Sequence, residues 1–139
     1  MIVIRAKRAQ GYHLAAGYVA AQFPHIVPEF PEIAGCHKAT INVELELPLV
    51  VSAPDHRTRP IDYEYQGRAC REVFEFLRIE LEAPVGAARV GAWLYIPSGS
   101  PHRRTPRIHE VLAPKIDIPA ECQCLIYIDR PFLGVYTRL

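Results

Sequence analysis

The sequence predicts a mainly β protein whose strands form a single closed or nearly closed barrel, and three observations lead to this prediction. The 13 prolines leave few windows long enough for a helix of about 10 to 14 residues. The segments between the prolines are rich in Val, Ile, Tyr and Phe, which favour strands. Roughly seven short strands that share one apolar set favour a closed barrel over an open sheet, because closure removes exposed strand edges.

The expected elements follow in chain order from apolar patterns bounded by turn residues. Short helical turns are expected at 30–34 and 108–112. The second follows Thr105-Pro106, where threonine would cap a helix that begins with proline. The strands are expected at about 2–8, 17–21, 40–47, 61–65, 73–82, 89–95 and 122–128.

The clearest of these strands is 40–47, where polar and apolar residues alternate without a break. A period of two is the mark of a half-buried strand, so its apolar residues would face the barrel interior. Thr40, Asn42, Glu44 and Glu46 would then face outward. The expected core consists of Ile41, Val43, Leu45, Ile79, Leu81, Leu94, Ile126 and Ile128.

Length and charge exclude several classes of protein. The 139 residues fit one domain, 1–139, which can bury roughly two thirds of its unfolded surface. Because the net charge is only +1, no overall field would attract nucleic acid or an anionic membrane, and any anion site must be local. The longest apolar runs, such as 47–51, are far shorter than a bilayer span, and the amino terminus lacks the pattern of a signal peptide. We therefore expect a cytoplasmic protein that binds neither nucleic acid nor membrane.

The four cysteines, Cys36, Cys70, Cys122 and Cys124, are expected to be reduced, because a chain of this length without an export signal does not need disulfides. Cys36, Cys122 and Cys124 could form a zinc site with His37. However, the usual Cys-x2-Cys spacing is missing, and free cysteine is a common core residue, so a structural role is favoured.

Thr40 and Asn42 form the first candidate site, because residues two apart on a strand project the same way. Hydroxyl and amide oxygens are hard ligands that a magnesium ion accepts when phosphates complete its shell. The alternative is a solvent-facing strand in which threonine serves only β-propensity, and the spacing alone favours this alternative.

The segment 98–110 is the second candidate site, because it is the best local anion site in the chain. Guanidinium groups, hydroxyl donors and free backbone N–H groups at a helix start bind phosphate. The alternative is a solvated basic loop that improves solubility or meets an acidic partner. Glu110 could act as a general base toward a substrate hydroxyl, or could pair with an arginine. The residues expected at this anion site are His102, Arg103, Arg104, Thr105 and Arg107.

Five segments stand in an order, and nearly at a spacing, that match a known family. They are 40–45, which opens a strand with Thr-Ile-Asn, the strands 76–81 and 91–97, then 108–114, which contains Glu110 and ends in Ala-Pro, and finally 125–129. In these features the chain resembles the CTP-dependent riboflavin kinases of archaea, which are small cradle-loop β-barrels. The similarity covers about residues 10–129.

The resemblance implies transfer of phosphate from CTP to the ribityl hydroxyl of riboflavin, with Mg²⁺ as the cofactor. Thr40 and Asn42 would stand in the positions of the family's magnesium-binding Thr and Asn, and Glu110 in that of its closing-motif Glu. Phosphoryl transfer depends mainly on positioning and charge neutralisation, so a metal held by few protein ligands is sufficient.

The chain departs from the family at the glycine-rich turn that lets the backbone approach the nucleotide. Gly11, Gly17 and Tyr18 remain of that turn, whereas alanines 15 and 16 do not readily take positive φ. An acid at Asp117 also stands near the place of a family arginine. A fold can outlast its function, so the departures leave room for another ligand.

Three hypotheses follow. The first is a diverged relative that binds a nucleotide, a flavin or another phosphorylated small molecule without the kinase chemistry. The second is an active CTP-dependent riboflavin kinase. The third is an interaction or scaffold barrel that could form a homodimer, with Trp93, Tyr95 and 131–136 as its binding surface.

Overall fold

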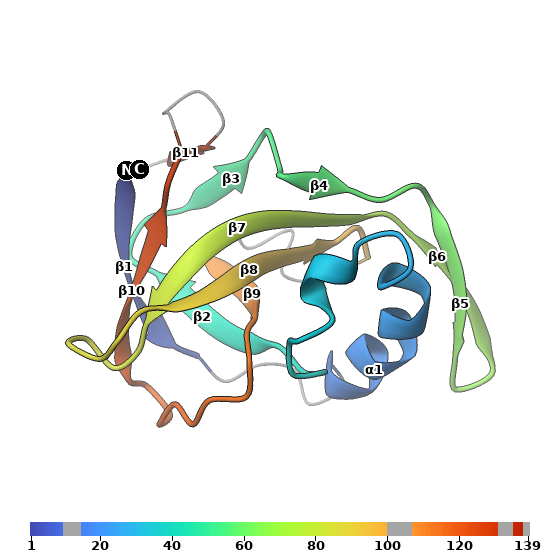
Figure 1. Cartoon of the computed structure of the whole chain (residues 1–139), viewed down its shortest axis with the longest axis horizontal. Coiled ribbons are helices and arrows are strands. Elements are labelled where there is room, and N and C mark those ends of the chain that lie inside the picture. The colour runs from blue at the N-terminus through green and yellow to red at the C-terminus, as the bar shows by residue number, and fades with distance from the viewer. Residues whose placement is uncertain (10–14, 100–106, 131–134, 138–139) are drawn as a thin grey trace.

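The computed structural model describes residues 1–9, 15–99, 107–130 and 135–137. Its central feature is a closed antiparallel barrel of six strands, in the order β10–β1–β2–β9–β8–β7, which β7 closes by pairing with β10. The predicted mainly β fold with a closed barrel is therefore confirmed (Figure 1). The barrel strands are β1 (Ile2–Arg8), β2 (Ile41–Leu45), β7 (Phe74–Glu82), β8 (Val90–Pro97), β9 (Ile108–Leu112) and β10 (Gln123–Ile128).

The barrel interior is filled by the apolar residues that the alternation places inward. Val43 and Leu45 on β2 are each only 1% exposed, as the pattern of 40–47 predicts. Ile41 is half-buried and packs against the same cluster. The other predicted core residues, Ile79, Leu81, Leu94, Ile126 and Ile128, all belong to this cluster.

A second layer covers the outer face of β7 and β8. It consists of α1 (Ala15–Ile26), the 3₁₀ helix η1 (Pro31–Ile33) and the hairpin of β5 (Ile61–Tyr65) and β6 (Arg68–Glu72), which lie to the right of the barrel in Figure 1. Large side chains from both layers form a second core. The strands β7 and β8 are thus buried on both faces over 74–77 and 92–95, whereas Arg78 and Glu80 of β7 are exposed. The second core includes Val19, Phe23, Ile26, Phe74, Phe76, Trp93 and Tyr95.

Three short strands complete the described fold. The strand β4 (His56–Arg57) pairs with β7, and β3 (Leu49–Val51) pairs with β11 (Val135–Thr137). The β5–β6 hairpin turns through Gln66 and Gly67, whose φ values of 52° and 74° are both positive. Two positive φ values are typical of the tight turn whose twist matches that of the flanking strands, and this is where glycine is needed. The expected strands did not include β3, β4, β6 or β11.

The expected strand at 17–21 is wrong, because this segment lies inside the helix α1. Alanine is the best helix former, and Val19, Phe23 and Ile26 recur at the spacing of one buried helix face. The many prolines had favoured a mainly β chain with few helices. However, Pro24 lies in the last turn of α1, where the helix loses only one backbone hydrogen bond.

The expected helical turn at 108–112 is also wrong, because these residues form the barrel strand β9. Val111 packs in the barrel core and Leu112 in the second core, so both faces of the strand are buried. Such a strand shows no alternation of polar and apolar residues. The expected turn at 30–34 is confirmed as η1.

Trp93 and Tyr95 are not a binding surface, in contrast to the third hypothesis. They are 9% and 2% exposed, because the second layer covers them.

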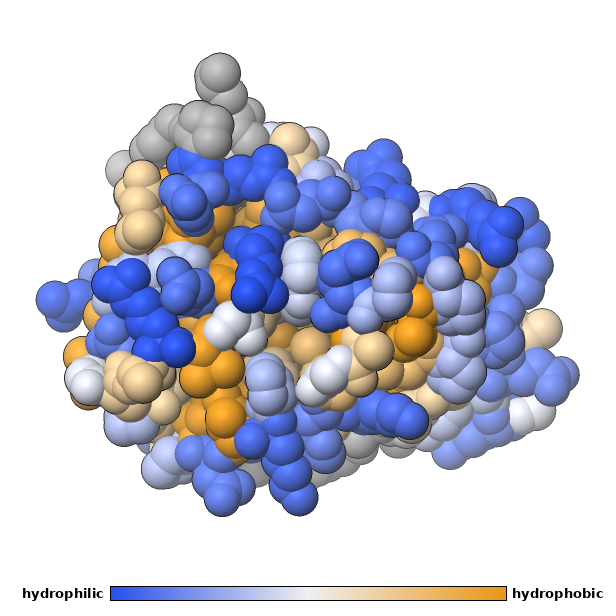
Figure 2. Space-filling model, viewed as in Figure 1, coloured by the Kyte–Doolittle hydropathy of each residue, from blue (hydrophilic) through white to orange (hydrophobic). Residues whose placement is uncertain are grey.

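Figure 2 shows that hydrophilic residues cover much of one face of the molecule, with hydrophobic residues in patches between them. All four cysteines are free. In the described part of the chain, no helix is both long and apolar enough to span a membrane.

Candidate metal and ligand site

The neighbouring strands β2 and β9 bring Thr40, Asn42 and Glu110 together. Asn42 lies directly opposite Glu110 in the antiparallel register. The Thr40 hydroxyl donates a hydrogen bond to Oε1 of Glu110 at 3.1 Å, although the two residues are 70 positions apart in the sequence. The two expected metal ligands and the expected general base therefore form one cluster.

Asn42 is more buried than its place on a polar strand face suggests. The residue is 8% exposed, and its carbonyl oxygen Oδ1 is buried without a hydrogen-bond partner among the described residues. The expectation of a solvent-facing side chain is thus wrong for Asn42. Leaving a buried acceptor unpaired costs about 1–3 kcal/mol. A hydrogen-bond donor or a cation bound to this oxygen would remove that cost.

The oxygens of this cluster suit a hard cation. A hydroxyl, an amide oxygen and the nearby carboxylate are the ligand types that Mg²⁺ accepts, with phosphates or water completing its shell. Glu110 is 7% exposed, so a cation at this site would be largely shielded from bulk water. The described residues contain no group of three or more His, Cys, Asp or Glu side chains that could hold a metal. The alternative zinc site at Cys36, His37, Cys122 and Cys124 therefore has no support in the described structure.

A buried hydrogen-bond network begins beside Glu110. Tyr95 lies opposite Glu110 in the β8–β9 register, and its hydroxyl donates to Oε1 of Gln22 on α1. Nε2 of Gln22 donates to the Tyr63 hydroxyl at 2.9 Å and to Oε2 of Glu72 at 3.3 Å. Burial, followed by the negative charges of Glu110 and Glu72, raises the pKa of Tyr95 well above its usual range. Tyr95 therefore stays protonated and able to donate.

The network also includes the Tyr63 hydroxyl, which donates to Oε2 of Glu72. Burial, followed by this hydrogen bond to Glu72, raises the pKa of Tyr63. The other carboxylate oxygen of Glu72 accepts from the backbone N–H of Gly99 at 2.7 Å.

The sequence interpretation missed Gln22, Tyr63 and Glu72. The signal for Gln22 was its position beside Val19 and Phe23 on one helix face, which is visible only once α1 is recognised.

Gly17 and Tyr18 lie on α1 and contact the β5–β6 hairpin rather than a ligand loop. A Cβ atom at Gly17 would lie 2.1 Å from the Tyr65 hydroxyl oxygen. The Tyr18 and Tyr65 rings lie 4.2 Å apart between centroids. Gly17 is therefore needed for close packing of α1 against the hairpin. Gly11 lies outside the described residues.

Arg107 is the one residue of the expected anion site that the structure describes. His102, Arg103, Arg104 and Thr105 lie outside the described residues. Arg107 is exposed and lines a pocket of about 400 Å³ together with Arg5 and Lys7 on β1 and Glu44 on β2. The expected helix start at residues 105–108 is wrong where it is described, since β9 begins at Ile108. The basic group of Arg5, Lys7 and Arg107 could not be read from the sequence, because it is built by strand pairing.

No family model matches the chain, and no curated protein is significantly similar to it in sequence.

Proposed function

We propose that this chain binds a phosphorylated small molecule of the nucleotide or flavin type through a magnesium ion at Thr40 and Asn42, as a diverged relative of the CTP-dependent riboflavin kinases. This proposal is based on the Oδ1 of Asn42, which is buried without a hydrogen-bond partner among the residues that the structure describes. Its neighbours supply a hydroxyl and a carboxylate. A magnesium ion would satisfy that oxygen and neutralise the charge of the phosphates.

In this proposal the residues around the ion have distinct roles. The Glu110 carboxylate holds the hydroxyl of Thr40, which fixes the direction of the threonine oxygen. Tyr95 and the residues bonded to it keep the outer faces of β8 and β9 rigid behind Glu110. Arg5, Lys7 and Arg107 line a separate pocket that begins at Glu44, two residues along β2 from Asn42, and could add positive charge for the phosphates.

Kinase activity is a second candidate, favoured by the position of Glu110. A carboxylate beside the metal ligands could accept the proton of a substrate hydroxyl during phosphoryl transfer. However, Gly17 packs against Tyr65 inside a helix, so it does not form the flexible glycine turn of the resembled family. We therefore expect little or no conversion of riboflavin to FMN in the presence of CTP and magnesium.

A thermal-shift screen with CTP, ATP, riboflavin and FMN, each with and without magnesium, tests the proposal. A ligand at 100 times its dissociation constant stabilises the protein by about 2.7 kcal/mol, which is easily detected. We expect a shift for at least one phosphorylated ligand that grows when magnesium is added. Thr40→Val should remove the magnesium-dependent part, because this change keeps the shape of the side chain but deletes its oxygen.

Asn42→Asp is the matched control, since it retains an oxygen at the same place and should preserve the magnesium-dependent shift. A magnesium-dependent shift that is unchanged in Thr40→Val and in Asn42→Leu would disprove the metal site. Robust formation of FMN that disappears in both variants would instead support the kinase and contradict the expected loss of activity.

A further inference from the structure

The outer face of β1 and β10 lies away from the second layer of the fold. In Figure 1 these two paired strands are at the left, whereas α1, η1 and the β5–β6 hairpin are at the right. Of the large hydrophobic side chains that the structure describes, the three that are exposed all lie on or beside these strands. They are Met1, Val3 and Val85, which are 70%, 52% and 52% exposed. Exposed apolar groups that gather on one face suggest an interaction surface.

Strand pairing places apolar side chains along one line of this face. Val3 on β1 lies opposite Tyr127 on β10. Near the other end of β10, the Val85 N–H donates a hydrogen bond of 3.1 Å to the carbonyl oxygen of Gln123. Leu125 lies between these two points and projects outward, because its neighbours along the strand project into the barrel core. Val3, Tyr127, Leu125 and Val85 together are called the β10 stripe.

Residues of opposite charge flank the β10 stripe. Arg5 and Lys7 lie on its β1 side, and Glu80 and Glu82 lie on its β7 side. Arg5, Leu125 and Glu82 form one row across the three strands. Arg5 and Glu80 are both exposed, and neither makes an ion pair with the residues that the structure describes. Each therefore has a charge available for a partner.

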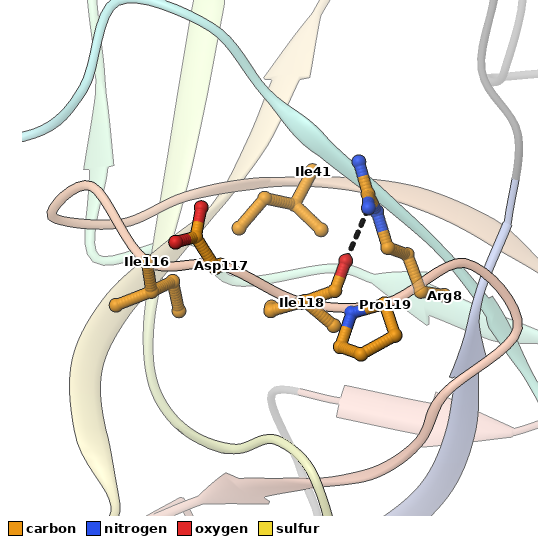
Figure 3. Close-up of a pocket in the computed structure, with 6 residues that line it drawn as sticks. All are labelled: Arg8, Ile41, Ile116, Asp117, Ile118 and Pro119. Atoms are coloured by element: carbon orange, nitrogen blue, oxygen red, sulfur yellow. Dashed lines mark hydrogen bonds between the residues drawn. The ribbon is translucent and has the colours of Figure 1, made fainter.

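The face is held in place by contacts at its borders. At the end of β1 the Arg8 guanidinium donates to the carbonyl oxygen of Ile118, as Figure 3 shows. On the other side the Tyr127 hydroxyl donates to Oε1 of Glu82 at 2.9 Å, and the guanidinium carbon of Arg89 lies 3.5 Å from the centre of the Tyr127 ring. A surface that is already ordered loses little conformational entropy when it binds a partner.

We propose that the β10 stripe is the interface of a homodimer, in which β10 packs face to face on β10 of a second copy about a twofold axis that runs along the strand. This rotation places β1 of each copy over β7 of the other. Leu125 then packs on the partner's Leu125, and Arg5 faces the partner's Glu82 and Glu80. The arrangement is that of two aligned sheets packed about 10 Å apart. It does not depend on the proposed ligand site.

The distribution of charge favours a second copy in this orientation. A twofold axis across the strands would instead place β1 on β1 and bring Arg5 and Lys7 against the same cations of the partner. A uniformly acidic partner would be repelled by Glu80, and a uniformly basic one by Arg5. A second copy rotated about the strand direction pairs both charges at once.

The size of the face predicts a weak dimer. Three strands about 4.8 Å apart and six residues long cover roughly 15 Å by 20 Å. This is less than the ~800 Å² that each partner contributes to a standard interface. We therefore expect a dissociation constant of roughly 10–100 µM and a protein that is largely monomeric when dilute.

Sedimentation equilibrium of the full chain between about 10 and 500 µM tests the proposal. The average mass should rise with concentration towards that of a dimer. Val3→Glu should abolish the rise, because it places a carboxylate in the β10 stripe opposite the partner's Glu80. Ala20→Glu is the matched control, since Ala20 is exposed on α1 in the second layer. This control should associate as the unchanged protein does.

A charge exchange tests the direction of the axis. Arg5→Glu and Glu80→Arg should each weaken association about tenfold or more, because the twofold axis creates two like-charge contacts in each variant. The double variant should regain most of the lost affinity, since it restores both pairs with their signs reversed. Circular dichroism of each variant verifies that it is folded.

Three outcomes would overturn the proposal. The first is a protein that stays monomeric up to about 500 µM, well above the expected dissociation constant. The second is association that is equal in Val3→Glu and Ala20→Glu, which would place the interface elsewhere. The third is a double variant that associates no better than the two single variants, because β1 would then not face β7 of the partner.

Discussion

Asn42 combines a buried side chain with a carbonyl oxygen that has no hydrogen-bond partner in the described structure. Nearly all buried polar groups in proteins are paired, so each exception needs a physical reason. A purely structural role does not explain the unpaired oxygen of Asn42, because an apolar residue would pack at the same place without the cost of desolvating a polar group. A ligand that pairs with this oxygen when it binds would explain why the polar side chain is present.

This reasoning makes a prediction about stability that does not depend on activity. In the absence of ligand, Asn42→Leu should leave the free energy of unfolding unchanged or raise it by up to ~2 kcal/mol, because it replaces an unpaired polar group by an apolar one of similar size. Urea denaturation measures the change. A loss of stability greater than about 1 kcal/mol would show that the amide is satisfied within the folded protein, and the argument for a ligand would fail.

At the scale of single elements, strand prediction succeeded for strands with clear alternation and for the long apolar strands β7 and β8. The strands β1 and β5 have the expected bounds of Ile2–Arg8 and Ile61–Tyr65. Prediction failed for β9, whose two faces are both buried, and for α1, which contains Pro24 in its last turn. The strand β9 has only five residues and no alternation, whereas β7 and β8, which are also buried on both faces over part of their length, are longer apolar runs and were predicted.

The candidate site shows the same limit. Thr40, Asn42 and Glu110 were each predicted from local motifs and a family resemblance, but their contact depends on the pairing of β2 with β9. Gln22, Tyr63, Glu72 and Tyr95 come from four different elements, so no local pattern links them. Strand pairing and helix docking are properties of the whole chain, which one sequence without relatives does not reveal.

The hydrogen bond from Tyr95 to Gln22 holds α1 to the barrel, and it makes stability depend on alkaline pH. The folded pKa of Tyr95 is raised, so above the usual value of about 10 the unfolded phenol loses its proton while the folded one keeps it. Unfolding then releases protons, and the free energy of unfolding falls as pH rises. Tyr63, whose folded pKa is also raised, contributes in the same direction.

Tyr95→Phe tests this link between α1 and the barrel. At neutral pH the variant should be less stable by ~1–2 kcal/mol, because Oε1 of Gln22 loses its donor. Above pH ~10 the difference should shrink, because the variant no longer carries the phenol whose ionisation favours unfolding. Urea denaturation at several pH values between about 8 and 11.5 measures both effects. A stability difference that stays constant over this range would contradict the buried, protonated state of Tyr95.

At the scale of the whole molecule, the two cores share the strands β7 and β8. Leu77, Ile79 and Leu94 pack into the barrel interior, whereas Phe74, Phe76 and Trp93 pack under α1 and η1. Adjacent residues of one strand therefore belong to different cores. Loss of either core would expose one face of β7 and β8 to water, and both strands also form part of the other core. We therefore expect the barrel and the helical layer to unfold together.

Trp93 makes this expectation measurable. It is the only tryptophan in the chain and lies in the second core, so its fluorescence reports on the helical layer, while far-ultraviolet circular dichroism is sensitive to the β-rich barrel. Urea transitions followed by the two signals should coincide, as they do in a two-state domain. A fluorescence change at lower urea would mean that α1, η1 and the β5–β6 hairpin leave the barrel first. In that case the second core, which contains Tyr95 opposite Glu110, would open before the barrel, and ligands at the metal site should stabilise the fluorescence transition less than the circular dichroism transition.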